Sequence, residues 1–208
     1  MALDTYSNLK AAVIDYSGRD DLSARMDDFI QLCETDIYYN EMTPLRIRTM
    51  ETTTELLTVA GTKTLALPSD YMESRSASIE SGGSEKTLAM LSPSSLSKSV
   101  SSGIPTAFTV SDTILFDKTP DSIYTINFTY YALPTPLSSD DPSNTVLELH
   151  PNIYLFGTLA QVYDFSGEPQ LSEHYFNKML RAIRGAIRGD RSGQYSPGAQ
   201  AKVRGSTP

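Results

Sequence analysis

Residues 122–165 read SIYTINFTYYALPTPLSSDDPSNTVLELHPNIYLFGTLAQVYDF, and the spacing of their apolar side chains changes once. From Tyr124 to Tyr131, apolar and polar side chains mostly alternate, which predicts a strand with one apolar face over 122–132. The stretch 133–144 holds three prolines in a polar setting and is typical of a connection. Apolar residues then recur at helical spacing and predict a helix over about 147–165. This stretch therefore joins a β region to a helical region.

The region before this stretch is rich in Thr, Ser and β-branched residues with frequent turn signals, including Ala60-Gly61 and Gly82-Gly83. Such a pattern is typical of short strands joined by turns. We expect six further strands, at 47–58, 62–67, 71–81, 85–91, 106–111 and 113–117.

Helical spacing appears at both ends of the chain. Thr5 can cap a first helix that Gly18 stops, and a second begins near Asp20 or Asp21 and ends over 40–44. A last helix is expected over 169–189, with Pro169 in its first turn.

These elements predict an α+β fold in which the terminal helices form one bundle and an antiparallel β-rich lobe is inserted between them. The chain length suits one domain with an inserted lobe. The expected parts are the first part of the bundle at 1–45, the β-rich lobe at 46–134, the second part of the bundle at 135–190, and a flexible C-terminal tail at 191–208.

Composition excludes several classes of protein. Cys33 is the single cysteine, so the chain has no internal disulfide and no cysteine-rich zinc site. The N-terminus lacks the basic and apolar regions of a signal peptide, and no apolar run has the roughly 20 residues of a membrane helix.

Charge is divided unevenly along the chain. The whole chain carries a net charge of -8, which is the sum of +6 in residues 178–208 and -14 in residues 1–177. On a helical wheel, four arginines lie within an arc of about 80° opposite an apolar face. They are Arg181, Arg184, Arg188 and Arg191.

This basic stripe has several possible roles. A solvated face favoured by the helix dipole is the simplest one. Docking to an acidic protein surface is the second, and nucleic-acid binding is the third, although the acidic body would repel phosphates and no aromatic residues interleave with the arginines. Binding to a membrane surface is disfavoured because the bundle needs the apolar face.

No motif indicates an enzyme or a metal site. His150 and His174 belong to no ligand-spaced pattern, and the nucleotide-binding and nucleophile motifs are absent. The sequence DDPSN at 140–144 resembles a calcium loop in composition, but Pro142 stands where a ligand should be and no glycine follows. We therefore expect no cofactor and no bound metal.

Paired carboxylates are the remaining catalytic candidates. Glu34 with Asp36, or Asp27 with Asp28, could in principle serve a glycoside hydrolase. Their place on a regular helix predicts ordinary solvated acids instead.

Several motifs resemble a known family in their order and spacing. They are a helix pair that contains AVIDYSGRDDL and DDFIQLCETDI, then LPSDYME at 67–73, GIPTAFTV at 103–110, and the long stretch FDKTPDSIYTINFTYYALPTPLSSDDPSNTVLELHPNIYLFGTL from residue 116. Across about residues 4–190 the chain resembles the head-to-tail adaptor (connector, or neck) proteins of short-tailed and related tailed bacteriophages.

The resemblance implies a structural virion protein in the neck between head and tail, made in the cytoplasm of the host bacterium. It implies a monomer before assembly and then a ring of about twelve copies under the portal protein. The ring would extend the DNA channel, pass DNA without specific binding, contact no membrane, and attach a tail nozzle or tube protein. Portal docking is expected from the last helix and the tail, through Arg181, Arg184, Arg188, Arg191, Tyr195, Lys202 and Arg204.

Two other functions remain open from the sequence. One is a nucleic-acid-binding protein that uses the C-terminal basic helix. The other is a virion-associated cell-wall hydrolase that uses a carboxylate pair.

Overall fold

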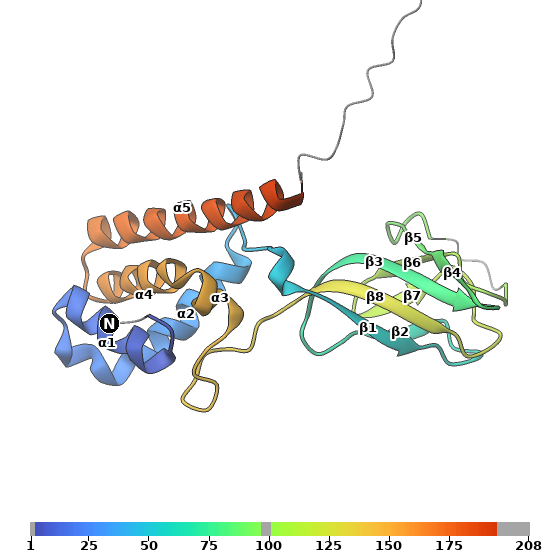
Figure 1. Cartoon of the computed structure of the whole chain (residues 1–208), viewed down its shortest axis with the longest axis horizontal. Coiled ribbons are helices and arrows are strands. Elements are labelled where there is room, and N and C mark those ends of the chain that lie inside the picture. The colour runs from blue at the N-terminus through green and yellow to red at the C-terminus, as the bar shows by residue number, and fades with distance from the viewer. Residues whose placement is uncertain (1–2, 97–100, 195–208) are drawn as a thin grey trace, which may run out of the picture. The chain divides into compact units, whose positions relative to one another are not determined.

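The computed structural model describes residues 3–96 and 101–194 and confirms the α+β fold (Figure 1). The chain divides into two compact units. One unit is Met1–Thr49 with Pro134–Pro208, and its described part is helical. The other unit is Met50–Leu133, and it contains the described strands. In sequence, the β unit therefore lies between the two halves of the helical unit.

The first half of the helical unit begins with α1, Tyr6–Ser17. Thr5 caps this helix, because its hydroxyl oxygen accepts from the backbone N–H of Asn8 at 3.3 Å. Gly18 ends it in the left-handed conformation, with φ 65°, where glycine has no steric penalty. Both helix-end predictions are confirmed.

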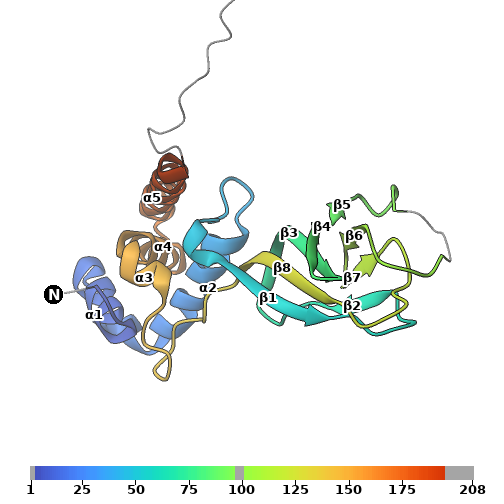
Figure 2. The same cartoon turned by 45° about the vertical axis from the view of Figure 1, so that its right-hand side comes forward.

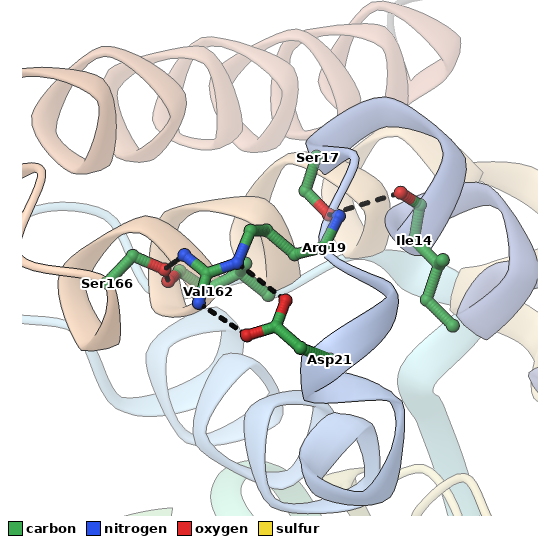
Figure 3. A network of polar contacts seen from close by, with 6 residues as sticks. All are labelled: Ile14, Ser17, Arg19, Asp21, Val162 and Ser166. Atoms are coloured by element: carbon green, nitrogen blue, oxygen red, sulfur yellow. Dashed lines mark hydrogen bonds and ion pairs between the residues drawn. The ribbon is translucent and has the colours of Figure 1, made fainter.

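The second helix begins differently from the prediction. A 3₁₀ helix, η1 at Asp20–Arg25, comes first, and α2 runs over Met26–Tyr39. Figure 3 shows how Arg19 holds this turn. Its guanidinium donates two hydrogen bonds of 2.8 Å to the two carboxylate oxygens of Asp21. It also donates to the Ser166 hydroxyl at 2.7 Å. Ser166 lies at the end of a helix from the other half of the unit, so Arg19 joins the two halves.

The second half of the helical unit contains α3, Thr145–Leu149, α4, Pro151–Phe165, and α5, Pro169–Gln194. The predicted single helix over 147–165 is therefore wrong, because it breaks at His150. Proline excludes helical backbone angles from the residue before it, and His150 has φ -137° and ψ 56°. Pro151 then takes the first position of α4, where its missing N–H costs nothing.

The last helix is longer than the predicted 169–189. It continues through Gly189, Asp190 and Gly193 to Gln194, so the first four residues of the tail predicted at 191–208 are helical. Glycine disfavours a helix by only about 1 kcal/mol per residue, which tertiary contacts can offset. One such contact is the ion pair of 3.0 Å between Arg48 Nε and Asp190.

Helix α4 packs against α5 on one side and against α1 and α2 on others (Figures 1 and 2). Gly157 of α4 lies directly against the Cys33 and Met179 side chains and leaves no room for a Cβ atom. The fully buried apolar side chains of this unit include Leu9, Met26, Ile30, Ile37, Leu45, Leu159, Met179 and Ile183.

The β unit contains two four-stranded sheets. The first has the order β1-β8-β3-β4 and the second has the order β2-β7-β6-β5. Their bounds are β1 Glu51–Leu57, β2 Thr64–Ala66, β3 Tyr71–Ser81, β4 Ser84–Thr87, β5 Ala89–Met90, β6 Ala107–Val110, β7 Thr113–Phe116 and β8 Thr125–Ala132. The aromatic strand predicted at 122–132 is β8, which lies between β1 and β3 and pairs with both.

Two strand predictions differ from the structure. The strand expected at 47–58 starts only at Glu51, because Arg48–Met50 forms a short 3₁₀ helix, η2. The strand expected at 85–91 is divided between β4 and β5, which belong to different sheets. β5 pairs with β6 in parallel, while the other pairs of these strands are antiparallel, as expected of the lobe.

The core of the β unit is apolar and aromatic. Its fully buried side chains are Phe108, Ile114, Phe116, Ile126 and Phe128. β8 alternates as predicted, since Ile126, Phe128 and Tyr130 are buried while Thr125, Asn127 and Thr129 are half-buried.

Asp117 supports the start of β6. Burial alone would raise the pKa of its carboxyl, but three hydrogen bonds outweigh burial and lower it. The donors are the Thr106 hydroxyl at 2.6 Å and the N–H groups of Thr106 and Ala107 at 2.9 and 3.0 Å. The carboxylate therefore satisfies backbone donors that the sheet leaves unpaired.

Candidate docking surface

The basic stripe on α5 has the predicted amphipathic arrangement. Met179, Leu180, Ile183 and Ala186 are buried, while Ile187 is half-buried. The opposite face is exposed and carries the four arginines Arg181, Arg184, Arg188 and Arg191. α5 thus presents a row of cations on a helix that the bundle fixes in place.

One arginine of the stripe is positioned by a neighbouring turn. Arg184 Nε donates to the Thr43 hydroxyl at 3.4 Å. Asn40 braces this turn, because its side chain accepts from Thr43 N at 2.6 Å and donates to the carbonyls of Thr43 and Asp36 at 3.0 and 2.8 Å. Met42, the residue before Thr43 on this turn, is 66% exposed.

A groove lies beside the stripe, within the helical unit. Its volume is about 370 Å³, and small residues of α5 line one wall. The other lining residues come from Ile47 and Thr49 and from the α3–α4 junction. The α5 residues are Ala182, Gly185, Ala186, Gly189 and Asp190.

The remaining predicted docking residues, Tyr195, Lys202 and Arg204, lie outside the described residues. The structure therefore brings together the four arginines of α5, and the contribution of the three tail residues stays a prediction.

The catalytic candidates do not form a site. Within residues 3–96 and 101–194, no group of three or more His, Cys, Asp or Glu side chains could hold a metal ion. His150 is half-buried at the helix junction, and burial lowers its pKa. His174 is exposed, and its ring meets the Tyr175 ring edge-on at 5.4 Å.

Three of the four carboxylates in these pairs are also engaged in the fold. Asp27 pairs with Lys10 Nζ at 2.8 Å, and Asp36 accepts from Gln161 Nε2 at 2.6 Å. The prediction of a solvated acid is wrong for Glu34, which is only 8% exposed. The helical spacing of apolar residues could have indicated that Glu34 is buried, because Glu34 follows Cys33 at the edge of the buried stripe of α2.

Glu34 belongs to a buried polar cluster that the sequence analysis missed. Its Oε1 accepts from Leu137 N at 2.9 Å and from the Tyr154 hydroxyl at 3.1 Å. Asn144 Nδ2 donates to the same hydroxyl at 2.8 Å, and the Tyr38 hydroxyl lies 3.2 Å from it. These contacts attach the 134–144 connection to α2 and α4.

Replacing Glu34 with glutamine is expected to stabilise the helical unit more at pH 7 than at pH 4. Burial raises the pKa of Glu34, and the two hydrogen bonds only partly oppose this. An acid with a raised pKa in the folded state favours folding fully below its unfolded-state pKa. That contribution is lost as pH rises through the folded-state value. Glutamine keeps an acceptor oxygen for Leu137 and Tyr154 but does not ionise.

The measurement for Glu34→Gln is urea unfolding followed by circular dichroism at 222 nm, from pH 4 to pH 7. Glu41→Gln, at an exposed position, is the matched control and should show no such trend. An advantage of Glu34→Gln that is constant or shrinks with rising pH would contradict the prediction.

Comparison with models of protein families gives a match over most of the chain. The family model described as SU10 adaptor protein matches residues 4–202. A search of curated proteins finds no match. Among the helices that the structure describes, none is long and apolar enough to cross a membrane.

Proposed function

Because the chain belongs to the SU10 adaptor protein family, a family of phage head–tail adaptors, we propose that it forms a ring beneath the portal in the virion neck. The ring, of about twelve copies that are monomers before assembly, extends the DNA channel and gives a tail nozzle or tube protein its attachment site. The protein has a structural role and no catalytic one.

The observation that carries the portal contact is the exposed arginine row of α5. A guanidinium can form two parallel, charge-assisted hydrogen bonds with a carboxylate, which makes arginine well suited to acidic protein surfaces. Within the row, Arg184 donates to the Thr43 hydroxyl, and the neighbouring Asp190 pairs with Arg48, so this part of α5 is already ordered before docking. Arg181, Arg184, Arg188 and Arg191 are the docking residues of this proposal, together with Tyr195, Lys202 and Arg204.

The charge balance supports a channel that passes DNA. Residues 1–177 carry a net charge of -14. Acidic surfaces repel phosphates and so prevent DNA from adhering as it moves. Nucleic-acid binding through the stripe is the alternative, and steeply salt-dependent DNA binding would favour it.

Reversing two charges of the stripe, Arg184→Glu with Arg191→Glu, is expected to weaken binding to purified portal rings by about 100-fold or more. Breaking a desolvated charge pair at an interface costs about 2–5 kcal/mol, so two reversals suffice for this loss. The measurement is co-sedimentation of the full chain with portal rings over a concentration series.

The matched control is Lys86→Glu with Lys63→Glu, which makes the same change of charge in the β unit. It should leave portal binding within a few-fold of the unchanged protein. Portal binding that the α5 variant retains, or that both variants lose equally, would refute docking through the stripe.

A further inference from the structure

We propose that adjacent copies of this chain meet when an exposed row on α2 of one copy enters the α5 groove of the next. The row consists of Asp28, Leu32 and Tyr39, and the groove is lined by Ala182, Gly185, Ala186 and Gly189. The inference rests on the proposed ring and identifies the faces that build it.

Gly185, one of the residues that line the groove, has no explanation within one copy. Gly185 lies in the middle of α5, where glycine is among the least favourable helix residues. A Cβ added there would meet nothing within 4 Å, so the fold of the single chain does not require its absence. Close approach of another backbone or side chain from outside explains a glycine at this position.

The α2 row contains two large side chains that are more than half exposed in the described chain. Leu32 is 51% exposed and Tyr39 is 60% exposed. Steps of four and seven residues place Asp28, Leu32 and Tyr39 within about 40° on the helix, on the side away from the buried stripe. Leucine and tyrosine side chains of this kind are typical of protein contacts rather than of a solvated helix.

The two surfaces match in length. Leu32 and Tyr39 are seven residues apart, and so are Ala182 and Gly189. At 1.5 Å per residue, each pair spans about 10.5 Å along its helix. Two large side chains on one helix therefore face two turns of small residues on the other.

The two surfaces also match in charge. Arg181 and Arg188 stand one turn to either side of Gly185, where they flank the groove. Asp28 precedes Leu32 by one turn, is exposed, and forms no ion pair within the described chain. When Leu32 and Tyr39 occupy the groove, Asp28 can meet one of these arginines.

The surfaces share no residue, so one copy can use both at once. Such a head-to-tail contact repeats from copy to copy and closes into a ring when its rotation permits. On the wheel, Arg184 and Arg191 lie about 100° and 120° from Gly185, farther from the groove than Arg181 and Arg188. On this inference Arg181 and Arg188, assigned above to the portal, contact the next copy instead, and Arg184 and Arg191 remain for the portal.

Site-directed cross-linking tests this contact. Leu32→Cys and Gly185→Cys are made in separate full-length chains, one with a size tag, and mixed with a short bis-maleimide reagent, with and without purified portal rings. Cys33, the single native cysteine, is buried and does not compete. The expected product is a mixed dimer that joins positions 32 and 185. Glu173→Cys, an exposed position near the start of α5, replaces Gly185→Cys as the control and should give none.

Exchanging the charges between the two surfaces tests whether Asp28 meets Arg181 or Arg188. Arg181→Glu with Arg188→Glu in the Gly185→Cys chain should abolish the mixed dimer, and Asp28→Arg in the Leu32→Cys chain should restore it. Absence of the 32–185 product in both samples, or cross-linking of the Leu32→Cys chain to the portal instead, overturns the inference. Sedimentation of the adaptor with portal rings reports the proposed function separately, so either can fail while the other stands.

Discussion

Gly157→Ala is expected to destabilise the helical unit by about 1–3 kcal/mol, although alanine is the best helix former. Gly157 lies in α4, where the helix faces both α2 and α5. A Cβ at this position would overlap Cys33 Sγ and lie 2.7 Å from Met179 Sδ. Both side chains are fully buried, so the bundle must separate or repack to admit one methyl group.

Gly185→Ala is the matched control, since it makes the same change in α5. Nothing lies within 4 Å of the added Cβ, so only the helix propensity changes. We expect this variant to stabilise the helical unit by about 1 kcal/mol. Urea unfolding followed by circular dichroism at 222 nm measures both. Shifts of the same sign would mean that the helices do not meet closely at Gly157.

Asn144→Ala is expected to destabilise the helical unit by about 2–4 kcal/mol. Asn144 is buried and caps α3, with its Oδ1 accepting from Leu147 N at 2.9 Å. Its Nδ2 donates to Thr135 O at 3.0 Å and to the Tyr154 hydroxyl at 2.8 Å. Loss of the cap costs about 0.5–2 kcal/mol, and each buried acceptor left without a donor costs about 1–3 kcal/mol.

The control for this variant is Asn177→Ala, at an exposed position of α5. Surface substitutions of this type change stability by about 0.5 kcal/mol or less. The same unfolding measurement applies to both variants. An Asn144→Ala protein as stable as the control would show that the connection 134–144 is not held by the buried polar cluster.

Local patterns predicted much of the fold. The alternation of β8 and the caps at Thr5 and Gly18 depend on neighbouring residues alone, and the structure confirms them. The exposed arginine row also follows from helical spacing and is confirmed as a feature of α5. Its role in docking stays a prediction.

Other features depend on residues far apart in the sequence. The burial of Glu34 results from contact with Leu137 and Tyr154, which lie more than 100 residues away. The continuation of α5 beyond Gly189 is supported by Arg48, which pairs with Asp190 from the other half of the unit. The local spacing of apolar residues predicts neither the contacts of Glu34 nor the Arg48–Asp190 ion pair.

The sequence by itself determined the class of fold, the strand and helix types, and the charge of each part, because backbone preference and periodicity are local properties. It also carried the family resemblance. Only the tertiary structure decided that Gly157 is a contact point while Gly185 is open, although both are helical glycines. A glycine has the same local preference at either position, and the difference comes from which side chains the fold places around it.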